Sequence, residues 1–341
     1  MQDPLFGQRD RAALWANRLG LTSVLDQLPC RNRLVVVNYH RIGDYREALN
    51  PNLYSATVDE LETQIQLLKR RYRILNIDEA IDYLRGGRSG QEAAALITFD
   101  DGYLDNYELA FPVLRDQQVP ATFFLTTSHV GSSHLTASDQ IAHLLRNPSQ
   151  ARFTLSYPRP LELDLQRRPF YVELRRVLQL YKATENRDPD RFFDHLRSHC
   201  PVDTLETAER RFVNWDEAAT MASEGMTIGS HTCTHPILSR LSLQDQIEEL
   251  TDSKRLIEQK LGRPTRSIAY PVGSLSAFSA TTQRAAAEAG YEIAFSHYGG
   301  FNEPGRTNLF DVRRNSVLSR TGRPRFRFRV AMARASGRWW F

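Results

Sequence analysis

Three clusters of ionisable residues in this 341-residue chain have the types and spacing that chemistry requires. Asp100 and Asp101 are adjacent, and His231 and His235 are separated by three residues. Two neighbouring carboxylates repel each other unless a cation or a proton relieves the conflict, and two imidazoles about one turn apart suit a divalent metal. One carboxylate and two histidines leave further positions on the metal for water and substrate. His40 is the third candidate, because it closes the apolar run LVVVNYH.

Each cluster also has a plainer explanation when it is considered alone. Asp-Asp-Gly is a common sequence of solvated turns, and a single pair of histidines is more often structural than metal-binding. Cys233 lies between the two histidines, and a thiolate ligand is a minor alternative because successive residues point in different directions. The combination is the argument for a metal site, since an acidic pair and a histidine pair each follow a predicted strand.

The elements that would position these residues alternate between short apolar strands and amphipathic helices. Thr57 followed by Glu60 has the pattern of a capping box at the start of a helix. This alternation favours a (β/α) barrel, with a doubly wound open sheet as the alternative. The C-terminal ends of parallel strands lie together, so we expect the three clusters to meet. Strands are predicted at 34–40, 73–77, 95–99, 121–127, 226–230, 267–271, 292–298 and 311–317, and helices at 57–72, 78–87, 103–118, 215–225, 242–262 and 276–290.

Residues 131–213 interrupt this alternation. They contain two amphipathic helical stretches around a small β-like piece, and we interpret them as an inserted helical subdomain. Insertions in barrels lie in strand–helix loops, so the segment is expected to form a lid or wall for the substrate, or equally to shield the barrel. The remaining divisions are an N-terminal helical extension at 1–32, the barrel at 33–318 and an Arg/aromatic tail at 319–341.

The composition, with 41% hydrophobic and 25% charged residues, is that of a globular protein and excludes a disordered or coiled-coil chain. The net charge of +4 is uneven, because residues 312–341 contain nine arginines and no Asp, Glu or Lys. The rest of the chain is mildly acidic, which argues against a nucleic-acid partner. The basic tail predicts contact with an anionic membrane surface or an acidic glycan, or packing of its aromatic side chains on the barrel.

Three cysteines do not form a disulfide framework, so an oxidising compartment is not required. The N-terminus lacks an apolar segment of signal-peptide length, and no apolar run approaches the roughly 20 residues of a membrane-spanning helix. The chain is therefore predicted to be cytoplasmic, with peripheral membrane attachment as a variant. The sequence leaves its oligomeric state open.

Three motifs carry a resemblance to a known family. TFDDGY (98–103), SHTCTH (230–235) and AYPVG (269–273), in that order, resemble the first three motifs of the polysaccharide deacetylases, also described as the NodB-homology fold or carbohydrate esterase family 4. The resemblance covers residues 33 to about 318 apart from the insertion. It implies a distorted (β/α)7-type barrel, and the early Tyr-His is similar to the subgroup that acts on exopolysaccharides such as poly-N-acetylglucosamine.

The resemblance also implies residue roles. Asp100 would be the general base that takes a proton from water. Asp101, His231 and His235 would hold one divalent metal ion, usually zinc and in some members another ion. The third motif would contact the substrate or the oxyanion, with a backbone N–H near Val272 as its donor. The residues of that motif are Tyr270, Pro271, Val272 and Gly273. Tyr103 is expected to line a sugar pocket for a different reason, because it directly follows the Asp-Asp-Gly turn.

Two departures from the family pattern need an explanation. The arginine that orients the base in many members is replaced by Ala269, and Arg266, Arg313 and Arg314 are the candidates to reach in from elsewhere. A late Leu-x-His motif, which supplies the acid in many members, is also absent. His40 is the favoured general acid, because the subgroup places this residue near the N-terminus, and His297 is the alternative.

The predicted function is a metal-dependent hydrolase that removes acetyl groups from N-acetylated sugars of an acetylated glycan or its precursor. The missing arginine and the missing late histidine motivate one alternative, a catalytically inactive relative that binds glycans. The second alternative is an amidohydrolase of a small non-sugar amide, because one fold hosts several chemistries.

Overall fold

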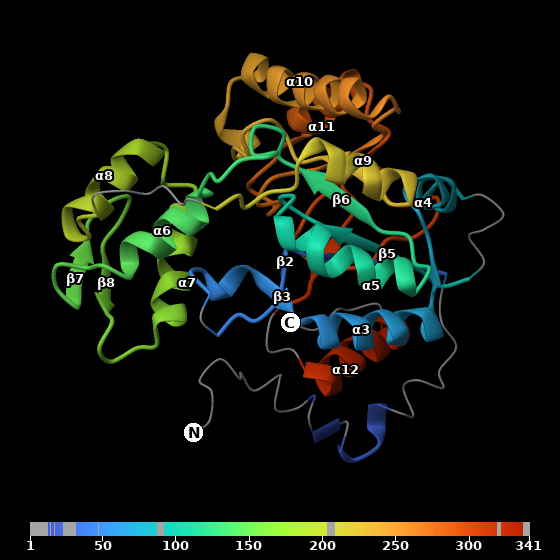
Figure 1. The fold of residues 1–341 in the computed structure, drawn as a ribbon, viewed down its shortest axis with the longest axis horizontal. Helices are drawn as coiled ribbons and strands as arrows, with labels where there is room; N and C mark the ends of the chain where they lie inside the picture. Colours follow the sequence, from blue (N-terminus) through green and yellow to red (C-terminus); the bar gives the residue numbers. More distant parts are fainter. Residues whose placement is uncertain are drawn as a thin grey trace.

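The computed structural model describes residues 13, 15, 16, 18–22, 32–46, 48–86, 92–202, 209–318 and 322–336. The predicted N-terminal extension, residues 1–32, lies largely outside this part of the chain, and so does the Trp-Trp-Phe end of the tail. Figure 1 shows a barrel surrounded by helices, with a second group of elements to one side.

A parallel sheet forms the centre of the described chain. Its strand order is β11 (Ile293–Phe295), β10 (Ser267–Ala269), β9 (Thr227–Ser230), β6 (Thr122–Leu125), β5 (Ala94–Phe99), β1 (Leu34–Tyr39) and β12 (Arg314–Ser316), and β4 (Arg73–Ile74) pairs with the first residues of β5. A parallel bridge between Phe295 and Val312 joins the two ends of this path. The sheet is therefore a nearly closed barrel, which confirms the predicted (β/α)7-type fold and excludes the open sheet.

The neighbouring strands β1 and β5 are buried along their whole length. Strands of a barrel are covered on both faces, and this explains their continuous apolar sequences. Their polar exceptions lie near the C-terminal ends, where Asn38 is in register with Thr98 and the Thr98 hydroxyl donates to Asn38 Oδ1 over 2.7 Å. The core thus becomes polar at one end of the barrel.

The surrounding helices begin where the sequence offers a cap. Thr57 and Glu60 form the predicted capping box of α3 (Val58–Arg71). The predicted strand 73–77 ends at Ile74, because Asn76 caps α4 (Ile77–Leu84). The predicted helix 276–290 begins late for the same reason, since Ser279 caps α11 (Ala280–Glu288). The other barrel helices are the π-helical η3 (Asn106–Ala110), α5 (Phe111–Asp116), α9 (Trp215–Ser223) and α10 (Leu243–Leu261).

The segment between β6 and α9 has a core of its own, separate from the barrel clusters. It contains α6 (Ala137–Leu145), the antiparallel pair β7 (Arg152–Leu155) and β8 (Leu161–Asp164), α7 (Phe170–Tyr181) and α8 (Pro189–His199). These elements lie together beside the barrel in Figure 1. The described residues of this segment form three helices where two were expected, because Asp188 caps α8 and Pro189 occupies its first turn.

Four short elements lie in the loops that follow β1 and β9. They are β2 (Arg41–Ile42), η1 (Pro51–Leu53), β3 (Tyr54–Ala56) and η4 (Leu238–Arg240). Strands β2 and β3 pair in parallel directly after the end of β1. This places Tyr54 and its neighbours close to the end of the barrel at which His40 emerges.

The basic tail contains a helix that the sequence analysis did not predict. Helix α12 (Gly322–Ser336) lies beside α3 (Figure 1), with Phe326 and Val330 buried in the barrel core. The Tyr72 hydroxyl donates to the Val330 carbonyl over 3.3 Å. This packing matches the expectation that aromatic residues of the tail cover the barrel, while its contact with a membrane or glycan stays a prediction. Among the described helices, none combines the length and apolarity needed to cross a bilayer.

Candidate active site

The predicted clusters meet at one end of the barrel, where the parallel strands finish. Asp100 and Asp101 follow β5, His231 follows β9, and His40 follows β1. His297 follows β11 at the same end. In parallel barrels this end carries the catalytic groups, because the loops after the strands are free to vary without disturbing the core.

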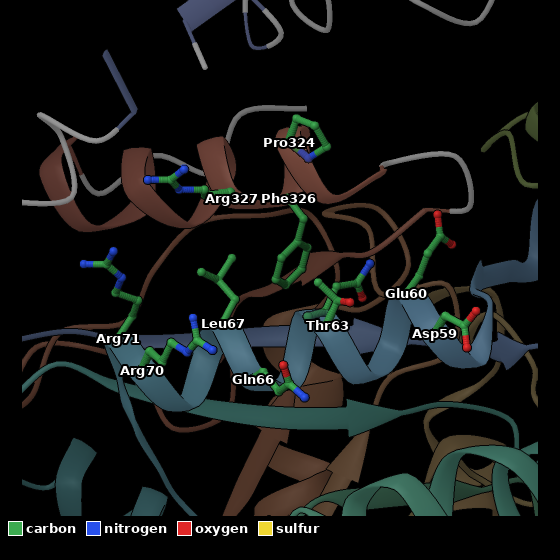
Figure 2. A pocket seen from close by; sticks show the side chains of 11 residues that line it. Asp59, Glu60, Thr63, Gln66, Leu67, Arg70, Arg71, Pro324, Phe326 and Arg327 are labelled. Atoms are coloured by element: carbon green, nitrogen blue, oxygen red, sulfur yellow. The ribbon is translucent and has the colours of Figure 1, made fainter. Parts of the chain in front are cut away.

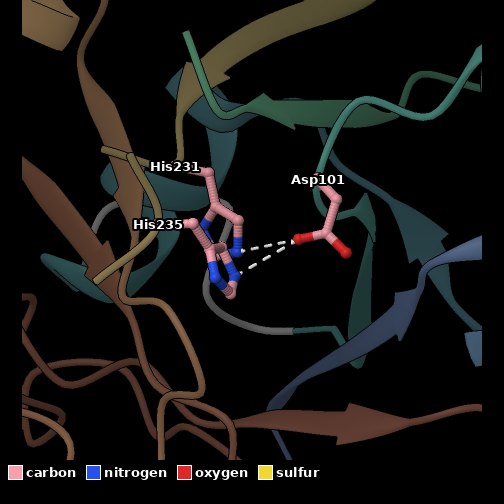
Figure 3. Close-up of side chains that lie close together, drawn as sticks. All are labelled: Asp101, His231 and His235. Atoms are coloured by element: carbon pink, nitrogen blue, oxygen red, sulfur yellow. Dashed lines mark ion pairs between the residues drawn. The ribbon is translucent and has the colours of Figure 1, made fainter. Parts of the chain in front are cut away.

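Asp101, His231 and His235 form a compact group (Figure 3). The Asp101 Oδ1 atom lies 3.4 Å from the Nε2 atom of each histidine. One ligand atom from each residue falls within 4.8 Å of the others. The Nδ1 atom of His231 donates to the Ala269 carbonyl over 2.7 Å, which fixes the tautomer and leaves Nε2 free to bind a metal. A carboxylate oxygen and two imidazole nitrogens in this arrangement fit a zinc ion.

Cys233 does not join this group. Its thiol donates to the Glu249 carbonyl over 3.6 Å, and burial raises the pKa of that thiol. The Glu249 carboxylate accepts from the backbone N–H groups of Cys233 and Thr234 and from the Thr234 hydroxyl. These bonds shape the loop that carries His235, so Glu249 positions a residue of the group from α10.

Asp100 is held by a different set of partners from Asp101. Arg314 Nη1 donates to Asp100 Oδ1 over 2.6 Å, and Nη2 donates to Oδ2 over 2.8 Å. Asn38 adds a bond of 2.9 Å to Oδ2 and accepts one from Arg314. Burial alone would raise the pKa of Asp100, but Arg314, with smaller contributions from His231 and His40, holds it well below its usual range. Asp100 is therefore ionised.

Of the three candidate arginines, Arg314 is therefore the one that pairs with Asp100. Its Nε atom donates to the Ser296 carbonyl over 3.1 Å, so the guanidinium is fixed along two edges. Of the other two candidates, Arg266 pairs with Glu292 and Asp78 away from the site, and Arg313 is exposed. The amino-acid sequence alone does not distinguish among these three arginines.

The two candidates for the general acid are neighbours. The ring centres of His40 and His297 are 5.8 Å apart. His297 Nε2 is engaged with the Ser316 hydroxyl at 2.6 Å, whereas among the described residues the His40 ring has no hydrogen-bond partner. Burial lowers the pKa of both rings, and for His40 this is opposed by Asp101 and Asp100. The His40 ring is therefore the one available to water or substrate.

Backbone strain is concentrated in the loops of this site. Positive φ angles occur at Asp101 (74°), Thr232 (68°), His235 (64°) and Val272 (63°). These are four of the five non-glycine residues with positive φ in the described chain. Such conformations cost about 1–3 kcal/mol each and persist where the surrounding structure enforces them, typically at functional sites.

The third motif borders the pocket through Val272, whereas its aromatic side chain, Tyr270, points into the barrel. Tyr270 is fully buried and donates its hydroxyl to the Phe310 carbonyl over 3.1 Å. Pro271 is also buried, whereas Val272 lines the pocket beside Asp101. Gly273 has a φ of 60°, and a Cβ atom there would lie 2.7 Å from the His297 backbone nitrogen. The Tyr270 side chain thus packs inside the barrel, and the substrate or oxyanion contact of this motif stays a prediction.

Tyr103 lies beneath the surface of the site and is not among the residues that border the pocket over Asp101, and its contact with a sugar stays a prediction. Its side chain is fully buried, and its hydroxyl donates to Asp139 Oδ2 over 3.1 Å. Phe212 stacks on the ring, and the Arg41 guanidinium lies 4.8 Å from its centre. Tyr103 instead connects the barrel to α6, because Asp139 belongs to that helix.

The pocket over Asp101 and His235 has a volume of about 160 Å³. Its opposite wall comes from the segment between β6 and α9, through Thr136, Tyr181 and Lys182. A larger cavity of about 660 Å³ lies between α3 and α12 (Figure 2) and shares no lining residue with this pocket. Size alone therefore does not locate the chemistry.

Comparison with known proteins agrees with the motifs. Residues 87–294 match the polysaccharide deacetylase family. The chain belongs to this family. The family predicted from the three motifs, and the class of enzyme that accompanies it, are confirmed.

Two curated relatives of this deacetylase-family chain cover different shares of it. YxkH of Bacillus subtilis is 24% identical over 274 residues, which are 80% of this chain and 66% of YxkH. The poly-beta-1,6-N-acetyl-D-glucosamine N-deacetylase of Staphylococcus epidermidis is 35% identical over 115 residues, which are 30% of this chain and 39% of that protein. The chain therefore spans less than two thirds of the length of either relative.

Solved structures show the same fold. The deacetylase PplD of Streptococcus pyogenes aligns with a TM-score of 0.56 at 19% identity, covering 87% of this chain and 96% of PplD. IcaB of Ammonifex degensii aligns with a TM-score of 0.56 at 20% identity, covering 91% of this chain and 99% of IcaB. At such identities the likeness supports the fold of this chain.

Several residues that support the site were not predicted from the sequence. Asn38 lies two residues before His40, and Ser316 lies two residues after Arg314. Alternate residues of a strand share a face, so this spacing was an available indication that both polar side chains accompany the catalytic candidates. Lys182 carried no comparable indication, because it follows α7 in the inserted segment.

Proposed function

We propose that this chain is a metal-dependent deacetylase that removes acetyl groups from N-acetylated sugars of a polysaccharide or its precursor. The observation that carries the proposal is the contrast between two adjacent carboxylates. Asp100 is locked on Arg314, and Asp101 faces His231 and His235. Neighbouring groups with such different partners are suited to different roles in one reaction.

The ion is proposed to be zinc, held by Asp101, His231 and His235 through the atoms that already face one another. When bound, such an ion lowers the pKa of a coordinated water and polarises the acetyl carbonyl. The His231–Ala269 hydrogen bond supports this assignment, because it orients the imidazole before any ion arrives. Asp100 takes no part in the ligand set, since Arg314 and Asn38 occupy both its oxygens.

Different side chains of the protein are proposed to accept and to donate the protons of the reaction. Asp100, kept ionised by Arg314, accepts a proton from the attacking water. The Val272 backbone N–H is proposed to donate to the oxygen that becomes negative, because Val272 borders the pocket in a strained conformation. His40 donates a proton to the leaving sugar nitrogen, a role supported by its uncommitted ring nitrogens.

Arg314 also removes the main reason for an inactive glycan-binding relative. That alternative rested on the lack of an arginine at Ala269 and of a late histidine. The Arg314 guanidinium from β12 pairs with Asp100, and two imidazoles, His40 and His297, lie at the same end of the barrel. The deacetylase proposal therefore needs no missing group.

The test is acetate release from N-acetylglucosamine oligomers by the zinc-loaded protein. Wild type should release acetate, and Asp100→Asn should lower kcat by about 10²–10⁴-fold, the usual contribution of a general base. Asp82→Asn, an exposed carboxylate on α4, is the matched control and should retain activity. Full activity of Asp100→Asn would contradict the role of Asp100. Binding of the oligomers without acetate release by wild type would contradict the proposed reaction.

A further inference from the structure

A second pocket adjoins the candidate active site and has a strongly basic lining. Its volume is about 490 Å³, which is in the range of small-ligand sites. Three cationic side chains border it, Lys182, Arg187 and Arg240. The hydroxyls of Thr184, Ser239 and Ser274 add hydrogen-bonding groups, and within the described chain no carboxylate contributes to the lining.

This basic pocket is continuous with the pocket over the proposed metal ligands. Lys182, Arg240 and Val272 border both spaces. A sugar whose acetyl group lies beside Asp101 and His235 would therefore place its neighbour on the chain at the basic pocket. The two walls come from different parts of the fold, because Lys182 and Arg187 follow α7 whereas Arg240 ends η4 on the barrel.

The positive charges of the pocket have no carboxylate beside them in its described lining. The carboxylate whose charge acts on Lys182 is Asp101, which borders the adjoining pocket. Arg240 donates to the Ala183 carbonyl over 2.7 Å, which fixes its position and leaves its charge uncompensated. Lys182 and Arg187 are exposed and Arg240 is half-buried, so an oxyanion in the pocket could accept charge-assisted hydrogen bonds from all three.

The same charges disfavour other occupants. A deacetylated glucosamine carries an ammonium group, which Lys182, Arg187 and Arg240 would repel. A neutral sugar could use the hydroxyls but would gain nothing from the three cations. A carboxylate or a phosphate ester matches both the charge and the donor groups, since arginine and lysine bind both oxyanions.

Resting on the deacetylase function proposed above, we propose that this pocket binds an anionic substituent, a carboxylate or a phosphate ester, on the sugar next to the acetylated residue. The preferred substrate is then an acidic glycan or a phosphorylated precursor. Lys182, Arg187 and Arg240 act as specificity-determining residues and take no part in the bond that breaks.

The experiment compares three oligomers of equal length with the zinc-loaded protein. One is neutral N-acetylglucosamine, one alternates N-acetylglucosamine with glucuronate, and one carries a phosphate ester beside the acetylated sugar. The anionic oligomers should have a higher kcat/KM than the neutral one. Arg187→Gln should lower the ratio of the anionic to the neutral kcat/KM by about ten-fold, which is the usual contribution of one partly exposed charged hydrogen bond. Arg187→Lys should restore part of it.

Arg175→Gln is the matched control, because Arg175 is an exposed arginine on α7 of the same segment. It should leave all three rates unchanged. A preference for only one anionic oligomer identifies carboxylate or phosphate as the bound group. Equal kcat/KM values for the neutral and anionic oligomers, or a ratio that Arg187→Gln does not change, would overturn the proposal while leaving the deacetylase function in place.

Calorimetric binding to the Asp100→Asn variant separates the two proposals. Tighter binding of an anionic oligomer than of the neutral one, lost with Arg187→Gln, supports the pocket even if no oligomer releases acetate. Absence of acetate release would count against the deacetylase function alone. Equal binding of neutral and anionic oligomers would overturn the anion pocket, whatever the rates are.

Discussion

Replacing Arg314 by methionine should strongly destabilise the protein, because it strands a buried carboxylate. The side chains of Arg314 and Asp100 are 0% and 3% exposed, and two hydrogen bonds of 2.6 and 2.8 Å join them. Removing one partner of a buried ion pair costs about 3–5 kcal/mol. Asn38 Nδ2 remains as a donor to Asp100, so we expect a loss near the lower limit, about 3 kcal/mol at pH 7.

The loss should depend on pH in a defined direction. In the native protein the pKa of Asp100 lies below its unfolded value, so its carboxylate stabilises the fold above pH of about 4 and loses this effect only in stronger acid. In Arg314→Met, burial without the guanidinium raises the pKa of Asp100 above the unfolded value. The difference in unfolding free energy between the two proteins should therefore shrink as the pH falls.

The assay is urea unfolding of the metal-free proteins followed by tryptophan fluorescence. Arg313→Met is the control, because this neighbouring arginine is exposed and should cost less than about 1 kcal/mol. In an Asp100→Asn background, Arg314→Met should cost about 2 kcal/mol less than in wild type. A loss below 1 kcal/mol in the single variant, or equal losses in both backgrounds, would refute the reasoning.

Two further predictions concern histidines at the same end of the barrel. Burial lowers the pKa of His129 to about 4, so as the pH falls the unfolded state binds a proton before the folded state does. The unfolding free energy should therefore fall by up to about 3 kcal/mol between pH 6.5 and 4. His129→Gln should weaken this dependence of the unfolding free energy on pH, and an unchanged dependence would contradict the assignment to His129. His40→Gln should lower kcat for acetate release by about 10²–10⁴-fold and His297→Gln by much less, and the reverse order would make His297 the general acid.

The sequence was informative where function depends on residues next to strand ends. Asp100, Asp101 and His231 each follow an apolar strand, and parallel strands finish at one end of a barrel, so their meeting could be predicted. The position of His235 beside His231 could be predicted from their separation by three residues. These predictions need only short stretches of sequence and the rule that parallel strands end on the same side of a barrel.

Long-range partners could not be predicted in this way. Arg314 is 214 residues from Asp100, and its neighbour Arg313 has the same chemistry. Which of the two points inward is decided by the register of β12 against β1, where Val36 pairs with Arg314. The burial of Tyr103 could not be predicted for the same reason. Its hydrogen-bond partner, Asp139, belongs to helix α6, which lies outside the motif that contains Tyr103.

The different roles of Asp100 and Asp101 are tested most directly by a crystal structure of the zinc-loaded protein, with anomalous scattering to locate the ion. We predict one ion about 2 Å from a carboxylate oxygen of Asp101 and from the Nε2 atoms of His231 and His235, with Asp100 still paired to Arg314. An ion bound by Asp100, or no ion at Asp101, would contradict this division of roles.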